Sequence, residues 1–467
     1  MKKLFTVVIV LAFFVLPVFA TDARINGLGV PAWMVQSDDS LVRIFQGQVV
    51  NYKNVIGINS TTEINLDVFD IMIFGSDPLQ IVSKAISYGG GYANLDLGGN
   101  VLGIFANPYN GVLKSNMHNL TGNLEETFLG ASGDIINPGY VDVPHRTYGI
   151  IYGLGLDNMS IGFSVGLADK TGSFKTESTI DTADTMDYST SVMSIEIGAG
   201  LSMPILDVGI TFGLPMVDNK GKDIDGTLDA PYREETLKSK SGMEIGANAR
   251  VNITPLVIGV SFAMNSLETE DIQLYDGNSD KDYEDSGIDT NERSLDKVNG
   301  MSVGGGVSAV FEVGNAKLYP GVAVNYSSKL GNSQYKQPNV SSDVWTEEEI
   351  GFNSLSIPIY LAAEGKISDA LNIRAGISKK IINSLSITEE RKISGGSKVD
   401  PQNKQTFNIN KTDSVELTGG FSVNIGGATI DATLTGGINV QNVPALGDIN
   451  IKFPGGLSSQ ISAKYAF

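Results

Sequence analysis

Cysteine is absent from the 467-residue chain, which excludes disulfides, thiolate metal sites and lipid-modified cysteines. Histidine is nearly absent, and neither His118 nor His145 has a nucleophile at the spacing of a catalytic motif. The serine-hydrolase elbow, the phosphate-binding loop and the zinc-protease motif do not occur either. We therefore expect no enzymatic activity and no cofactor.

Basic residues are also scarce, because 33 Lys and Arg face 52 Asp and Glu and give a formal charge of −19. Nucleic-acid binding depends on basic patches that neutralise phosphates, so we expect no nucleic-acid partner. An acidic surface of this kind repels polyanions.

Long apolar runs are missing everywhere except at the start. Lys2 and Lys3 precede an apolar run over 4–19, and Val18-Phe19-Ala20 resembles a cleavage site. The pattern predicts an exported chain with a signal peptide over 1–20; a retained anchor is the alternative, but the run is short for the ~20 residues of a span. Without a later apolar helix, only a closed β-barrel could carry the remaining chain through a membrane.

What the chain does contain is alternation. Apolar residues of 193–201 and 243–251 alternate with small or polar ones, and further runs at 159–168 and 355–362 do the same. These runs approach the roughly 9–11 residues of a tilted membrane strand. A soluble sandwich also alternates, but its strands are typically about 5–6 residues long, so the length favours a barrel.

Turn signals separate these runs. Expected tight turns lie at Gly98-Gly99-Asn100, Asp157-Asn158, Pro204, Asn252–Pro255, Gly314-Asn315, Ser368-Asp369 and Gly426-Gly427. Expected long loops lie near 110–146, 170–189, 215–240, 266–297, 329–352, 382–412 and 438–455. Short turns on one side and long loops on the other are typical of outer-membrane barrels.

The strand count follows from these turns. A first strand at Thr62–Ile71, seven hairpins and the terminal strand give 16 strands, or 14 if one hairpin is misassigned. The predicted fold class is all-β, a transmembrane antiparallel up-and-down barrel over 61–467, in the outer membrane of a Gram-negative-type bacterium and in contact with its lipid.

The last strand, Leu457–Phe467, places Tyr465 and Phe467 on an apolar face opposite small and polar residues. We interpret this aromatic end as an assembly signal for the barrel-assembly machinery. Residues 21–60, in contrast, show no clean alternation. We expect this segment to fold into the lumen as a partial plug; a loose periplasmic lead-in is the alternative.

Charged residues on the lumen-facing side of the strands are the candidates for solute selectivity. They are Asp96, Glu196, Asp207, Glu244, Arg250, Glu312, Glu364, Arg374, Glu416, Asp431 and Lys464. An open lumen with a mild acidic bias is one interpretation. The other is that these charges pair with one another and with the N-terminal segment, which leaves a plugged interior.

One loop has alternating oxygen donors that could wrap a calcium ion: Asp276, Asn278, Asp280 and Asp282. Lys281 stands where a calcium loop of the helix-loop-helix type has its glycine, so a solvated acidic loop is the favoured interpretation and no metal is expected.

The order of parts resembles the FadL-like transport proteins for hydrophobic solutes. A Gly-containing start at 23–29, the acidic step Asp38-Asp39 and the segment Asn51-Tyr52-Lys53-Asn54 precede the barrel. Gln46-Gly47-Gln48 stands where such proteins often have Asn-Pro-Ala. The resemblance implies a channel for passive passage of small solutes, hydrophobic ones among them. The alternative function is a structural or surface-interaction barrel with a closed lumen and acidic ligand-binding loops.

Overall fold

The computed structural model describes most of the chain. The described residues are 23–36, 38–66, 83–106, 146–177, 185–225, 230–275, 290–336, 345–394, 400–410, 415–442, 449–452 and 457–467. The predicted signal peptide, both histidines and the four oxygen donors of the calcium candidate loop lie outside them.

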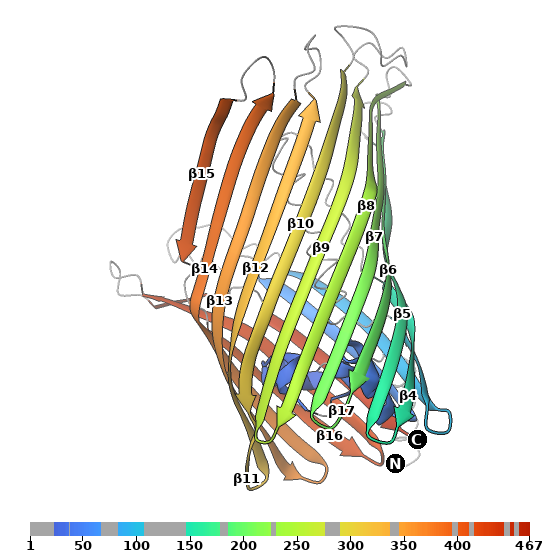
Figure 1. Ribbon diagram of the computed structural model, residues 1–467, viewed down its shortest axis with the longest axis vertical. Coiled ribbons are helices and arrows are strands. Elements are labelled where there is room, and N and C mark those ends of the chain that lie inside the picture. Colours follow the sequence, from blue (N-terminus) through green and yellow to red (C-terminus); the bar gives the residue numbers. More distant parts are fainter. Residues whose placement is uncertain are drawn as a thin grey trace.

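One antiparallel sheet closes on itself into a barrel (Figure 1). Its elements are β1 (Val55–Leu66), β2 (Ser83–Asp96), β3 (Val101–Ala106), β4 (Arg146–Leu156), β5 (Met159–Glu177), β6 (Thr185–Ser202), β7 (Leu206–Asp225), β8 (Ala230–Ile253), β9 (Leu256–Tyr275), β10 (Thr290–Ala309), β11 (Phe311–Val313), β12 (Ala316–Lys336), β13 (Trp345–Ser368), β14 (Leu371–Ser394), β15 (Asp400–Asn410), β16 (Val415–Ile425), β17 (Ala428–Asn442), β18 (Ile449–Lys452) and β19 (Leu457–Ala466).

Three pairs of these elements each occupy one position in the wall. β10 and β11 both pair with β12, β15 and β16 with β14, and β18 and β19 with β17. Each remaining element pairs with its sequence neighbours, and β1 pairs with β19 to close the ring. The barrel therefore has 16 strand positions, which confirms the predicted count and fold class.

All seven expected tight turns are present, and they lie at one end of the barrel. The first strand, however, begins earlier than predicted. β1 starts at Val55 rather than near Thr62, because Val55 and Ile56 pair with Ala466 and Tyr465 of the terminal strand. This partner is 411 residues away in the chain at Val55, so the local pattern at Val55 could not reveal it.

The expected long loops were also wrong in extent. Most of 170–189, 215–240, 266–297, 329–352 and 382–412 belongs to strands, and β8 and β13 each reach 24 residues. The polar ends of these strands continue the ladder beyond the length that a membrane requires. Backbone pairing depends on register with the neighbouring strand and not on side-chain polarity, so polar composition alone misled the assignment.

The outer surface of the wall is apolar. On β5 and β6, Phe163, Val165 and Ile197 are each at least half exposed, whereas Ser194 on β6, which pairs with Ala168, is fully buried. Further exposed apolar side chains occupy β4, β7, β9, β14 and β16. Apolar residues outside and small or polar residues inside are the pattern of a lipid-embedded barrel, because lipid replaces the usual hydrophobic core on the outer face.

The residues before β1 form four short helical elements inside the barrel near its tight-turn end (Figure 1). They are α2 (Ala23–Leu28), η1 (Ala32–Met34), η2 (Asp39–Arg43) and η3 (Gln46–Asn51). Together with the residues between them, they are called the N-terminal segment, residues 23–54. Within the described part of the chain, no helix has the length and apolar character needed to cross a membrane.

Candidate functional site

The N-terminal segment reaches opposite sides of the lumen wall. α2 lies against β13, β14, β16, β17 and β19, whereas η3 lies against β3 to β7, and η1 contacts β9. Apolar side chains anchor both ends: Leu28, Met34 and Val35 pack with Tyr319 and Ala362 of the wall. At the other end, Val42 and Val49 pack with the inward residues Val101 and Ile151.

Glycines in the wall permit this close approach. A Cβ at Gly162, Gly209 or Gly376 would overlap a backbone carbonyl of the segment, from Gln46, Ile44 and Leu28 respectively. Because these overlaps involve backbone, a flexible side chain could not relieve them. The segment therefore rests directly on the wall, and the lumen is occupied at this level.

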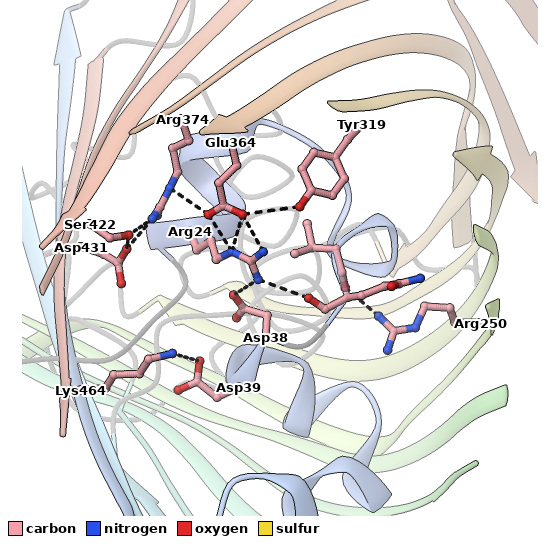
Figure 2. Close-up of polar contacts among 12 residues, drawn as sticks. Arg24, Asp38, Asp39, Arg250, Tyr319, Glu364, Arg374, Ser422, Asp431 and Lys464 are labelled. Carbon is pink, nitrogen blue, oxygen red and sulfur yellow. Dashed lines mark hydrogen bonds and ion pairs between the residues drawn. The ribbon is translucent and has the colours of Figure 1, made fainter. Parts of the chain in front are cut away.

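A charged cluster around Glu364 holds the α2 end (Figure 2). Arg24 donates to both carboxylate oxygens, with Nε to Oε1 at 3.0 Å and Nη2 to Oε2 at 2.8 Å, which is the bidentate geometry of a strong pair. Arg24 also reaches Asp38 at 3.4 Å. Behind Glu364, Arg374 lies 3.7 Å from the same carboxylate and pairs with Asp431 at 2.7 Å.

A second buried pair holds the middle of the segment. Arg250 on β8 pairs with Asp207 on β7 at 2.7 Å, and both side chains are 2% exposed. The same guanidinium donates to the backbone carbonyl of Val35 at 2.8 Å and lies over the ring of Phe45. The wall pair thus also binds the backbone of the N-terminal segment.

The C-terminal strand supplies a third contact. Lys464 lies 3.7 Å from Asp39, which also accepts a hydrogen bond from the hydroxyl of Tyr92 on β2. Asn26 donates to Gln460 at 2.6 Å. β19 therefore closes the barrel and contacts the segment from the same inner face.

The surroundings of the N-terminal segment keep Arg24 charged and Tyr52 neutral. Burial opposes ionisation of Arg24, but the hydrogen bonds with Glu364 and the charge of Asp38 outweigh it and raise the pKa of Arg24. Burial, reinforced by Asp38 and Asp39, also raises the pKa of Tyr52, which keeps its phenol neutral.

The structure divides the predicted lumen residues into three groups. Those with ion pairs in this site are Asp207, Arg250, Glu364, Arg374, Asp431 and Lys464. Asp96 and Glu312 lie at tight turns, where they pair with Lys53 and Lys317. Glu416 is exposed, and Glu196 and Glu244 lie together on the wall without an ion pair to any described residue. A role of these residues in selectivity remains a prediction.

The aromatic residues of the predicted assembly signal lie outside the lumen. Tyr465 on β19 is 49% exposed, and Phe467, which follows the last residue of that strand, is 56% exposed. The sequence missed Tyr319 and Ser422 as partners of Glu364 and Arg374. It also missed Arg24 as an ion-pair donor, although its neighbourhood stood out as a Gly-containing start. No local signal marks these three residues, because their partners are distant in the chain.

Comparisons with known proteins give structural likeness only. No protein-family model and no curated protein matches the sequence. Similar solved structures include a Pseudomonas aeruginosa FadL homologue, with 9% identity and a TM-score of 0.40 over 97% of this chain and 99% of that one. The Ralstonia pickettii toluene transporter TbuX has 12% identity and a TM-score of 0.40 over 97% and 100%. The Pseudomonas putida toluene transporter TodX has 10% identity and a TM-score of 0.38 over the same shares.

At these TM-scores the likeness carries no argument about solute or mechanism. The architecture itself, an outer-membrane type of β-barrel, rests on the closed strand ladder and the apolar outer face.

Proposed function

We propose that this protein is an outer-membrane channel for passive passage of small solutes, hydrophobic ones among them, and that its N-terminal segment is the gate. One observation carries the proposal: the segment crosses the lumen at the tight-turn end and joins the wall covalently at Val55, while side-chain contacts hold the rest. Those contacts can break and re-form without any change in the strand ladder.

The polar nature of the contacts supports a movable segment. Arg24 and Glu364 keep 22% and 16% of their side chains exposed, and Lys464 keeps 36%, so water can replace each partner when the segment moves. Partly exposed ion pairs are weaker than buried ones, because solvent screens them. These partly exposed pairs therefore resist movement of the segment less than the buried contact of Arg250 with the Val35 carbonyl does.

The inner face above the segment is suited to solute passage. On β5, Ser160 and Gly162 contact the segment, and the inward residues above them are Ser164, Gly166 and Ala168, all of them small. Small inward side chains leave room between opposite walls of a barrel with 16 strand positions. No energy source is needed for a solute that moves down its gradient.

Single-channel recording in planar bilayers tests the proposal. We expect brief conductance steps from the intact mature chain and long-lived steps when residues 21–54 are deleted. Because the chain has no cysteine, Asn26→Cys and Gln460→Cys can be joined by a short bifunctional maleimide, and this crosslink should silence the intact protein. Single Asn26→Cys, treated identically, is the matched control.

Uptake of a small aromatic hydrocarbon into proteoliposomes tests the solute class alongside the ion current. Uptake that the crosslink abolishes supports a gated path for hydrophobic solutes. If neither the intact nor the deleted form conducts ions or takes up the hydrocarbon, the channel proposal is wrong and the structural barrel is favoured.

A further inference from the structure

Two carboxylates and a glycine share one row of the lumen wall. In the ladder, Glu196 on β6 lies directly opposite Gly213 on β7, and Gly213 lies directly opposite Glu244 on β8. All three face the lumen, because their outward neighbours Ile195, Ile197 and Leu214 are exposed. Gly213, which has no side chain, therefore has one acidic side chain on each side of it in this row.

Within the part of the chain that the structure describes, no basic side chain forms an ion pair with either acidic group. Glu244 is 2% exposed, and neither of its carboxylate oxygens has a hydrogen-bond partner there. The hydroxyl of Ser194, fully buried on β6, has none either. Neither Glu196 nor Glu244 forms an ion pair with a described residue. Buried carboxylates without partners are costly, so native proteins keep them neutral, pair them or place a metal ion between them.

The space over Gly213 is where these groups converge. A Cβ placed on Gly213 would lie 3.0 Å from Oε2 of Glu244 and 3.4 Å from Oγ of Ser194. Two unpartnered oxygen atoms from different strands thus face the same small volume. The cluster differs from an ordinary acidic surface, because Glu244 and Ser194 are buried and direct unpartnered oxygens toward one cradle, with the half-buried Glu196 beside it in the ladder.

We propose that Glu196, Glu244 and Ser194 bind a hard divalent cation, Ca²⁺ or Mg²⁺, over Gly213. All donors are oxygen, which suits these ions and not softer metals. Two carboxylates match a charge of +2. The described residues contain no group of three or more acidic or histidine side chains that could hold a metal ion. Water therefore completes the coordination shell here, as is usual for Mg²⁺. The ion would neutralise the wall above the N-terminal segment.

Isothermal titration calorimetry on the folded full chain in a non-chelating detergent tests the site, with CaCl₂ and MgCl₂ as probes at constant ionic strength. We expect one saturable binding event, and a rise in the melting temperature with cation concentration that NaCl at equal ionic strength does not produce. This readout requires no transport, so it succeeds or fails independently of the channel proposal.

Three variants sharpen the test. Glu196→Gln with Glu244→Gln should abolish binding while the barrel stays folded, because it removes two uncompensated charges. Gly213→Ala keeps both charges but fills the cradle, and it should weaken binding at least tenfold. Glu416→Gln removes an exposed inward acid elsewhere and should leave binding unchanged.

Absence of saturable binding in the parent protein would overturn the proposal, as would equal binding by the double glutamine variant. A stabilisation that NaCl reproduces would also overturn it, because screening alone would then account for the effect.

Discussion

The bidentate pair between Arg24 and Glu364 predicts how tightly the N-terminal segment is held. In the docked segment, Arg24 makes two charge-assisted hydrogen bonds to one carboxylate, at 3.0 and 2.8 Å. Hydrogen bonds to charged groups contribute about 1.5–3 kcal/mol to stability. Since 1.4 kcal/mol is a factor of ten, Arg24→Gln should raise the population of the displaced segment by about 10–100-fold.

Replacing Glu364, the partner of Arg24, should displace the segment more than Arg24→Gln does. Glu364→Gln leaves Arg24 charged and half-enclosed, and it also removes a neighbour of Arg374, whose side chain is 1% exposed. A buried charge that loses its partner is penalised for desolvation. The double variant, which removes both charges, should therefore displace the segment less than Glu364→Gln alone.

Cysteine labelling measures this equilibrium, because the chain has no other thiol. Ala23, fully buried in α2, is changed to cysteine, and its maleimide labelling rate reports the displaced population. Lys366→Gln is the control: it breaks the Lys366–Asp369 pair at an exposed tight turn and should leave the rate unchanged. A rate for Arg24→Gln within twofold of the parent would refute the reasoning.

Three further outcomes follow from the same contacts. Asp207→Asn leaves Arg250 buried without its carboxylate, and we expect a loss of about 3–5 kcal/mol in the free energy of unfolding by denaturant; Asp369→Asn, at an exposed turn, should change it little, and equal losses would contradict the burial argument. Gly209→Val places a side chain where the Ile44 carbonyl lies, so channel open time should lengthen in bilayers while the barrel persists; unchanged gating would speak against direct contact. Phe467→Ser removes an exposed outer aromatic and should lower the yield of assembled protein in the outer membrane, whereas Phe311→Ser, at another exposed aromatic, should lower it less; normal assembly would count against the terminal strand as a signal.

Much of the architecture could be predicted from local pattern. Alternation at 159–168 and 193–201 gave the correct inner and outer faces, because side-chain direction in a strand depends only on parity. Glycine, asparagine, aspartate and proline placed all seven tight turns, since these residues suit the backbone of tight turns. The limits of β1 and the extended polar strand ends could not be predicted, because each depends on a partner strand.

In the barrel interior too, the sequence identifies residues but not their partners. Several inward residues could be named from the sequence, among them Arg250, Glu364 and Arg374, but their partners could not. Arg24 and Glu364 are 340 positions apart, and only closure of the barrel brings α2 to that wall. For the same reason, the sequence left a wet lumen and a paired, occupied one as equal alternatives.

From the sequence alone, alternation and turn residues predict a membrane barrel of 16 or 14 strands, the two faces of its clearest strands, and the places where the chain reverses; the closed ladder has 16 strand positions. Only the folded barrel shows which inward charges pair and which wall glycines admit the N-terminal segment. It also shows that oxygens of Glu244 and Ser194 converge over Gly213 without a hydrogen-bond partner among the described residues. The physical reason is range: parity and turn geometry act over a few residues, whereas charge pairing and close packing depend on ring closure between strands at opposite ends of the chain.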